Sequence, residues 1–317
     1  MARLRVLVHG GADAATQGRG AAEAAASAAL RLLEGGAGPL EAAVEACRLL
    51  EDDGRFNAGR GRMLRIDGAT RELDAACMTG DGKLGAAVGL RGFRNPILVA
   101  RAIHGTPHHA LAGPGLEAFA ASLGLERMPP PGEDVLADWR EMAEELAAGA
   151  PSSTGWTLQG LRKAWNYPTP MPPPSGGLGT AGAAAGVRAA AGGASAVAGC
   201  DTVGAVATDG RTFAAASSTG GLGVALQGRV SDVPLPGCGL HAGPDGAVVV
   251  TGHGEHMVRT MASLRVYERM AIVGVKDAVE SVVRDAHGRA HIGVLAVGRD
   301  GGHAATNRSM PWAQAVA

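Results

Sequence analysis

In the amino-terminal part of the chain, short apolar runs typical of buried strands alternate with stretches whose apolar residues recur at helical spacing. Apolar residues fill positions 6–8 before His9-Gly10-Gly11, which is typical of a short buried strand that ends in a tight loop. Helical spacing follows, interrupted at Gly35-Gly36 and resumed at Pro39, residues that end and begin helices. This part therefore predicts strands at 6–8, 72–78 and 86–90, and helices at 21–33, 39–50, from Pro96 with Asn95 as the N-cap, and 114–123.

The carboxy-terminal part begins with two β-compatible runs, 202–208 and 211–217, on either side of Asp209-Gly210. An Asp-Gly pair between such runs predicts a hairpin with a two-residue turn. The remaining pattern predicts strands at 247–251 and 292–297 and helices at 255–270 and 276–286. Because helices come in pairs between groups of strands, this order favours layered α/β packing over a repeated βαβ winding.

The stretch between these two parts has a different character. Proline triplets at 129–131 and 172–174 bracket one amphipathic stretch, and a Gly/Ala tract without periodicity fills 175–199. We therefore expect a flexible linker over about 128–200. A long structureless linker inside one domain is unusual, and it makes sense if the chain is cut at its end.

Composition and charge exclude several classes of function. The chain has 317 residues, of which 46% are hydrophobic but only 3% aromatic, and it contains 50 glycines, so we expect a core of closely approaching backbones. A net charge of −1 argues against a nucleic-acid-binding protein, because the chain has no excess of basic residues to contact phosphates. No apolar stretch is long enough to cross a membrane. Four scattered cysteines without a CxxC pair and a start without a signal peptide predict reduced thiols in the cytoplasm: Cys47, Cys77, Cys200 and Cys238.

The candidate chemistry lies where the linker meets the hairpin. A hydroxyl nucleophile needs an activating base, and no GxSxG elbow is present. A terminal threonine can use its own α-amine, whose reference pKa is about 7.7–8.0. Asp201-Thr202 stands directly before the apolar run of the first hairpin strand, so the sequence provides a bond to cut and a threonine to expose. The alternative is that Thr202 merely begins a strand.

Three neighbouring groups fit such a site. Thr219 ends the second hairpin strand and so lies beside Thr202. Arg229 and Asp232 are the opposite charges that bind the carboxylate and ammonium of an α-amino acid, although a surface ion pair would look the same. Thr251-Gly252-His253-Gly254-Glu255 follows a strand and opens a helix, where backbone N–H groups can stabilise an oxyanion or simply form a turn.

Other patterns carry no site. The GxGxxG match at 177–182 lies in the Gly/Ala tract with no strand before it, which argues against a dinucleotide site. His108-His109 lies in a loop, and His287 and His291 lack the glutamate of a zinc motif. The sequence therefore predicts no catalytic metal.

Nine motifs in order resemble those of the plant-type asparaginases, also called isoaspartyl peptidases, of the N-terminal-nucleophile hydrolases. The resemblance covers most of the chain except about 128–199. The motifs are His9-Gly10-Gly11, Phe56-Asn57-Ala58-Gly59-Arg60-Gly61, Glu72-Leu73-Asp74-Ala75, Arg94-Asn95-Pro96, Thr202-Val203-Gly204-Ala205-Val206, Ser218-Thr219-Gly220-Gly221, Gly228-Arg229-Val230, Thr251-Gly252-His253-Gly254-Glu255 and Ser309-Met310-Pro311-Trp312.

The resemblance implies a fold and an activity. The fold is an α+β four-layer αββα sandwich formed by a single domain, 1–317. Self-cleavage would give an α chain, 1–201, and a β chain, 202–317, and two such pairs would form an (αβ)2 heterotetramer. The activity is release of L-aspartate from L-asparagine and β-aspartyl dipeptides without a catalytic cofactor.

The resemblance also implies roles for individual residues. Thr202 would be nucleophile and base, with Thr219 assisting it and Asn57 ordering its surroundings. Arg229 and Asp232 would hold the substrate, and the remaining contacts would come from the oxyanion pair Thr251 and Gly252 and from Gly254. A structural sodium ion would be bound, largely by backbone carbonyls, at Leu50, Glu51, Asp53, Phe56, Ala58 and Arg60.

One departure leaves two alternatives open. Asp201 stands where asparaginases of this type usually have glycine, and Asp-Thr is similar to glycosylasparaginases and threonine aspartases. A carboxylate there could act as a base in self-cleavage. An unprocessed binding protein with the same fold is the alternative from another class.

Overall fold

The computed structural model describes residues 3–12, 18–60, 63–150, 152, 155–171 and 202–317. It has a mixed α/β architecture with two β-sheets. Its helices are α1 Arg19–Glu34, α2 Pro39–Asp53, α3 Pro96–His104, α4 Gly113–Ser122, α5 Glu133–Ala147, α6 Leu158–Lys163, α7 Gly254–Thr260 and α8 Ala262–Asp285. Its strands are β1 Arg5–His9, β2 Leu73–Thr79, β3 Leu84–Leu90, β4 Ala110–Ala112, β5 Val203–Thr208, β6 Phe213–Thr219, β7 Leu240–Gly243, β8 Gly246–Gly252, β9 Ile292–Gly298, β10 Gly301–Thr306 and β11 Trp312–Val316.

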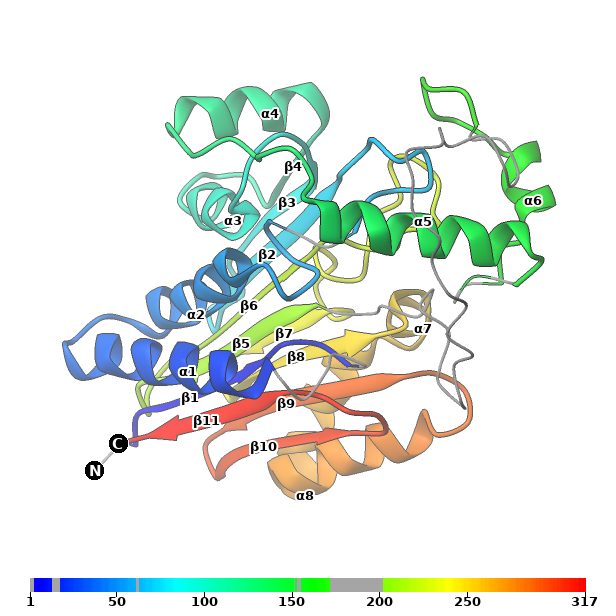
Figure 1. Ribbon diagram of the computed structural model, residues 1–317. Helices are drawn as coiled ribbons and strands as arrows, with labels where there is room; N and C mark the ends of the chain where they lie inside the picture. The colour runs from blue at the N-terminus through cyan, green and yellow to red at the C-terminus, as the bar shows by residue number, and fades with distance from the viewer. Residues whose placement is uncertain (1–2, 13–17, 61–62, 151, 153–154, 172–201) are drawn as a thin grey trace.

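The larger sheet has seven strands in the order β11-β1-β5-β6-β2-β3-β4, and the smaller has four in the order β10-β9-β8-β7. Helices α1, α2 and α3 pack on one face of the larger sheet, whose other face packs against the smaller sheet through contacts such as β5 with β8 and β1 with β9. Helix α8 packs on the smaller sheet, on the side opposite α1 and α2 in Figure 1.

The central strands β1, β5, β8 and β9 are buried on both faces, which explains why they are nearly continuous apolar runs rather than alternating ones. In β1, Val6 and Val8 face the helices while Leu7 faces the second sheet. In β8, Val249 faces the first sheet while Val248 and Val250 face α8. The period of two therefore sorts the apolar side chains of one strand between two separate cores.

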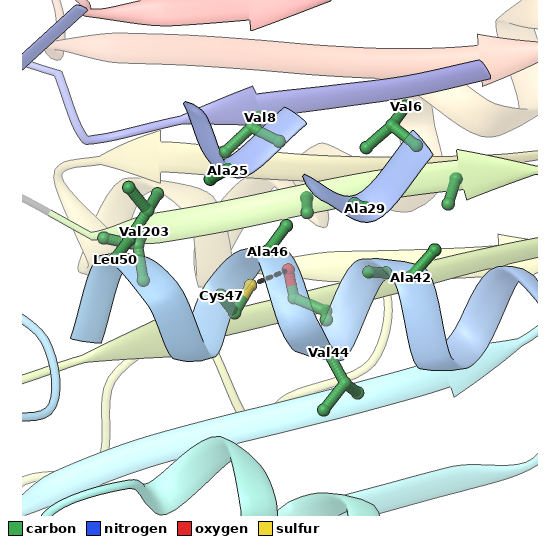
Figure 2. Packing of buried hydrophobic residues seen from close by; sticks show 14 of the residues in the cluster. Val6, Val8, Ala25, Ala29, Ala42, Val44, Ala46, Cys47, Leu50 and Val203 are labelled. Carbon is green, nitrogen blue, oxygen red and sulfur yellow. Dashed lines mark hydrogen bonds between the residues drawn. The ribbon is translucent and has the colours of Figure 1, made fainter. Parts of the chain in front are cut away.

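Small side chains let the helices approach the larger sheet closely. Figure 2 shows Ala42, Ala46 and Cys47 of α2 directed at the strands of the larger sheet. The Cys47 thiol donates a hydrogen bond to the carbonyl of Ala216 in β6, with an Sγ–O distance of 3.3 Å. The expectation of a core of closely approaching backbones, made from the glycine and alanine content, is confirmed.

Local predictions agree with the structure to different degrees. The hairpin turn has four residues rather than the predicted two, because Thr208 pairs with Phe213 and the Asp209 carboxylate accepts hydrogen bonds from the N–H groups of Arg211 and Thr212. The prediction of a helix from Pro96 with Asn95 as the N-cap is confirmed, although the Asn95 side chain makes no capping bond and its amide instead donates to Glu51 and Asp52. The predicted break between helices 255–270 and 276–286 is confirmed at Gly274, whose φ of 80° and ψ of 166° are non-helical, so α8 consists of two helices that meet at a kink. The first predicted helix is also interrupted at Met261, which separates α7 from α8.

The predicted flexible linker is wrong over its described residues. We call residues 133–171 the helical segment, of which the structure describes all but 151, 153 and 154. Val135, Trp139, Met142 and Leu146 form the buried stripe of α5, and they pack in one cluster with residues such as Leu64, Ile66 and Val224. Large apolar side chains provide enough burial to order the segment. The rest of the predicted linker, 172–200, lies outside the described residues.

No described helix is both long enough and apolar enough to pass through a membrane.

Candidate active site

The hairpin of β5 and β6 brings two threonine hydroxyls together. Val203 pairs with Ser218 across the hairpin, so Thr202, one residue before β5, lies opposite Thr219 at the end of β6. The Thr202 Oγ1 donates to the Thr219 Oγ1 over 3.1 Å, and both side chains are buried. The structure therefore brings together the two hydroxyls that the sequence predicts to be neighbours. Asp201 lies outside the described residues.

Asn57 fixes the turn that follows Thr219. Its backbone carbonyl accepts from Gly220 N over 2.8 Å, and its side-chain amide donates to the Gly221 carbonyl over 2.8 Å. The Gly221 N–H in turn donates to Thr219 Oγ1 over 3.0 Å. A side chain on Gly220 would lie 2.2 Å from Asn57 Oδ1, so only glycine allows this approach. Asn57 is therefore positioned to hold Thr219 in place.

The loop after β1 connects the hairpin to the candidate oxyanion pair. His9 pairs with Gly204 in β5, and three residues later the Ala12 N–H donates to Thr251 Oγ1 over 3.2 Å. Thr251 and Gly252 end β8, which packs against β5. Gly252 has φ 130°, and a side chain there would lie 2.1 Å from the carbonyl of His291. Glycine is thus required where β8 turns into α7.

Gly254 lies between the two charged groups predicted to bind an amino acid. A side chain on Gly254 would lie 2.7 Å from Asp232 Oδ1 and 2.8 Å from Arg229 Nη2. Because Gly254 has no side chain, the space beside its Cα atom adjoins both Asp232 and Arg229. The structure therefore brings Arg229, Asp232 and Gly254 together, as the sequence predicts.

Arg229 has an ion-pair partner that the sequence does not reveal. Its guanidinium donates from Nε and Nη2 to Glu255 Oε1, over 3.0 and 2.9 Å. The Glu255 side chain is 47% exposed and the Arg229 side chain 14% exposed, so this pair lies at the edge of the site. Burial raises the pKa of Asp232 to about 6, although the nearby Arg229 charge opposes this shift.

Asp74 connects the two groups of site residues, a role that the sequence does not reveal. It pairs with Thr219 across β2 and β6, and its Oδ2 accepts from the N–H of Ser231 over 2.7 Å. Its Oδ1 accepts from Gly89 N over 2.8 Å. One buried carboxylate thus fixes the loop that carries Arg229 and Asp232 relative to the hairpin. Its motif was visible in the sequence, but a contact between residues 157 apart was not.

His9 is a second buried polar residue beside the hairpin. Burial lowers its pKa to about 3, with a weaker opposing contribution from the Thr202 backbone, so the imidazole is neutral near pH 7. A side chain on Gly204 would lie 2.5 Å from His9 Nε2. His9 therefore supports the strand that follows Thr202 as an uncharged packing partner.

The predicted sodium loop lies at the end of α2. Leu50, Glu51 and Asp53 belong to its last turn, and Gly54 ends the helix with φ 77°. The Glu51 carbonyl accepts from Arg60 N over 3.3 Å and the Phe56 carbonyl accepts from Ala58 N over 2.9 Å. Burial raises the pKa of the Glu51 carboxyl to about 8, against hydrogen bonds from Ser218, Asn95 and Ile97. Among the residues that the structure describes, no group of three or more His, Cys, Asp or Glu side chains could hold a metal ion.

The comparison with known proteins gives a family. A family model described as asparaginase matches residues 3–317. The plant-type L-asparaginase of Pyrococcus horikoshii is 34% identical over 266 residues, 81% of this chain and 76% of that protein. The isoaspartyl peptidase of Salmonella typhimurium is 35% identical over 263 residues, 80% of this chain and 72% of that protein. The isoaspartyl peptidase of Escherichia coli is 32% identical over 301 residues, 90% of this chain and 83% of that protein. The chain therefore belongs to the asparaginase family, the one that its motifs resemble.

Proposed function

We propose that the protein is a self-cleaving threonine hydrolase that releases L-aspartate from L-asparagine and from β-aspartyl dipeptides. The observation that carries this proposal is that Asp74 joins the two groups of site residues. It pairs with Thr219, the partner of Thr202, and accepts from Ser231 in the loop that carries Arg229 and Asp232. Family membership supports the same reaction, since related proteins are named L-asparaginase and isoaspartyl peptidase.

Self-cleavage would use the hydroxyl of Thr202. Its Oγ1 attacks the carbonyl carbon of Asp201, the peptide C–N bond breaks as the nitrogen takes a proton, and an ester forms. The Asp201 carboxylate would accept the hydroxyl proton. Water then hydrolyses the ester, which leaves residues 1–201 with a new carboxylate and Thr202 with a free α-amine. Thr219 would orient Oγ1 for this step through their 3.1 Å hydrogen bond.

Substrate hydrolysis would use the same oxygen. The free amine of Thr202, whose reference pKa of about 7.7–8.0 lies near neutrality, accepts the Oγ1 proton as Oγ1 attacks the substrate's side-chain amide carbon. Thr251 and the Gly252 N–H would stabilise the oxyanion. Ammonia or an amino acid leaves with the proton, and water hydrolyses the aspartyl ester to L-aspartate.

Arg229 and Asp232 would set the orientation of the substrate. Arg229 would bind the α-carboxylate through two N–H groups. The substrate carboxylate would then take the place that Glu255 occupies in the structure. Asp232 would accept the α-ammonium, and Gly254 leaves room for both contacts. Together these contacts would place the substrate amide carbon next to Oγ1, which is the main requirement for a fast attack.

We further propose that the observed layers are the αββα sandwich of N-terminal-nucleophile hydrolases and that two cleaved copies form an (αβ)2 heterotetramer. The packing of α1–α3, the two sheets and α8 supports the first part. A sodium ion at 50–60 would fit, because the last-turn carbonyls of α2 lack helical partners and carry partial negative charge. Three buried free cysteines, Cys47, Cys77 and Cys238, support a cytoplasmic location.

A substrate panel tests the proposed reaction. We expect turnover of L-asparagine and of a β-aspartyl dipeptide, and little turnover of glycosylated asparagine or of a peptide with an internal aspartate. The opposite order would support the alternative that Asp201 suggests, a glycosylasparaginase or a threonine aspartase. A protein inactive on all four substrates and uncut would be the non-catalytic alternative.

A further inference from the structure

A buried ion pair lies beside the loop that connects Thr219 to Arg229, and we call residues 220–228 the connecting loop. The side chains of Arg65 and Glu72 are only 2% and 3% exposed, and Arg65 Nε lies 3.7 Å from Glu72 Oε2. Buried ion pairs are often no more stabilising than apolar side chains of the same volume. They do fix directions, because a guanidinium donates its hydrogen bonds within a rigid plane. The pair therefore suits a positioning role.

Arg65 holds the first part of the connecting loop. Its Nη1 donates to the carbonyl of Leu222. A side chain on Gly221 would lie 2.9 Å from Arg65 Nη1 and 3.0 Å from Nη2, so the guanidinium packs directly against this glycine. The Gly221 N–H donates over 3.0 Å to Thr219 Oγ1, which also accepts from Thr202 Oγ1. Arg65 therefore fixes the residues around the N–H group that orients the Thr219 hydroxyl.

Glu72 holds the last part of the connecting loop. Its Oε2, the oxygen that faces Arg65, accepts from the Gly228 N–H over 2.9 Å. Gly228 directly precedes Arg229, which is proposed to bind the substrate's α-carboxylate. Burial lowers the pKa of Arg65, the Glu72 carboxylate opposes this shift, and the nearby Arg229 charge adds to it. One buried pair thus anchors both ends of the loop, the end that leads from Thr219 and the end that leads to Arg229.

We propose that Arg65 and Glu72 are positioning residues that act on the two halves of the active site through opposite ends of the connecting loop. This inference rests on the proposed function. Arg65 keeps the Thr219 hydroxyl aligned with Thr202, so it sets kcat and the rate of self-cleavage. Glu72 keeps Arg229 where it meets the α-carboxylate, so it sets KM. Both act through the backbone of the loop, and neither reacts with the substrate.

Two double variants separate the anchors without leaving either buried charge unpaired, which would itself be destabilising. Arg65→Met with Glu72→Gln removes both charges and the Arg65 anchor, but keeps an amide oxygen for the Gly228 N–H. Arg65→Met with Glu72→Met removes that acceptor as well. The two proteins therefore differ in the anchor at Gly228. Arg101→Met is the matched control, because Arg101 pairs with Glu41 of α2 instead of the connecting loop.

The proposal predicts separate effects on kcat and KM for asparagine. The Met/Gln variant should lower kcat by about tenfold or more with KM nearly unchanged, because a small displacement of Thr219 misaligns the attacking hydroxyl. Its self-cleavage, followed by intact mass, should slow to a similar degree. The Met/Met variant should in addition raise KM by about tenfold, because Arg229 loses its alignment with the carboxylate, without slowing self-cleavage further. Rates are measured per cleaved chain, and the control should match the wild type.

The contrary outcomes are distinct. Wild-type kcat in the Met/Gln variant, or equal KM in the two double variants, would overturn the proposal. The same holds if kcat, KM and self-cleavage change equally in both, in step with a lower free energy of unfolding, because the pair would then be merely structural.

Two further measurements keep the result unambiguous. Arg65→Lys, which retains the charge beside Glu72 but offers a single donor group, covers a failure of the double variants to fold. A lower kcat with unchanged KM in this variant would support the proposal, and an unchanged kcat would overturn it. A wild type that does not turn over asparagine would overturn the proposed function itself, whereas an active wild type with unaffected variants overturns only the roles of Arg65 and Glu72.

Discussion

The layers of helices and sheets and the helical segment are packed in different ways. Around α1, α2, β1, β5 and β6 the core is built largely from alanine and valine, so that backbones touch. The same close approach continues to β3 and α3, where a side chain on Gly85 would lie 2.2 Å from the carbonyl of Ala100. The helical segment is instead held by large side chains such as Trp139 and Met142.

This difference shows in which region backbone positions are fixed and in which region side chains can be exchanged. Close backbone contacts in the layered body set the positions of Thr202, Thr219 and Gly254, so one added methyl group there displaces a site residue. Cores of large side chains tolerate exchange of volume better. The layered body would therefore fix the positions of the reacting groups, while the helical segment would tolerate more exchange of side-chain volume.

The largest expected effect comes from removing the buried indole of Trp139 from the helical segment. Trp139→Ala should cost about 3–5 kcal/mol, because the indole is buried against Leu64 and neighbouring apolar residues. We expect this loss to be local, with faster hydrogen exchange over α5 and unchanged protection of β5 and β6. Equal loss of protection in both regions would mean that segment and body are a single cooperative unit.

The second prediction adds one methyl group beside Asp232 and Arg229, the charged side chains proposed to bind the substrate. Gly254→Ala should lower kcat/KM for asparagine by about 100-fold or more, because the new carbon would overlap Asp232 Oδ1 and Arg229 Nη2. Gly20→Ala, in α1, is the matched control, since a side chain there meets nothing within 4 Å. Steady-state kinetics should show the control at wild-type activity, and a fully active Gly254→Ala would refute the placement of these charges.

The third enlarges the alanine core. Ala205→Val should lower the free energy of unfolding by about 1–3 kcal/mol, because Ala205 of β5 is fully buried among the residues of α1 and α2. The same change at the half-buried Ala143 of α5 should cost less than about 1 kcal/mol. Urea denaturation measures both, and equal costs would show that the two cores do not differ as proposed.

The smallest effect concerns pH. Burial raises the pKa of Asp232 to about 6, so the carboxylate is ionised above this pH and becomes neutral as the pH falls below it. Affinity for the product L-aspartate should therefore weaken by up to about tenfold per pH unit below 6. Calorimetric titration measures this affinity, and Asp232→Asn, whose side chain carries no charge, should bind more weakly and show a flatter pH profile. His9 does not interfere, because its pKa is about 3.

Local patterns predicted much of the site. The order of the two hairpin strands sufficed to bring Thr219 near Thr202, because antiparallel strands place the start of one beside the end of the other. Their exact pairing did not follow, since a two-residue turn at 209–210 would put Ser217 opposite Thr202, whereas the four-residue turn puts Thr219 there. The motif around Gly254 was visible for a different reason: glycine is required where the backbone closely approaches charged side chains.

Contacts between distant residues could not be predicted. The Asp74–Ser231 bond and the Arg229–Glu255 pair depend on how separate strands and loops come together, and no local pattern encodes that. The pairing of β11 with β1 is likewise set by the assembled sheet. In the helical segment the stripe of α5 was readable, but the surface against which it packs was not, because that surface comes from residues 63–66 and 222–226.

The central claim is that Thr202 becomes a terminal nucleophile. Intact mass and terminal sequencing of the purified wild-type protein and of Thr202→Ala test it most directly. The account predicts that the wild type yields two chains, the second beginning Thr202-Val203-Gly204-Ala205, and that Thr202→Ala remains one inactive chain of 317 residues. An active wild type that stays uncut, or a Thr202→Ala protein cut before residue 202, would contradict it.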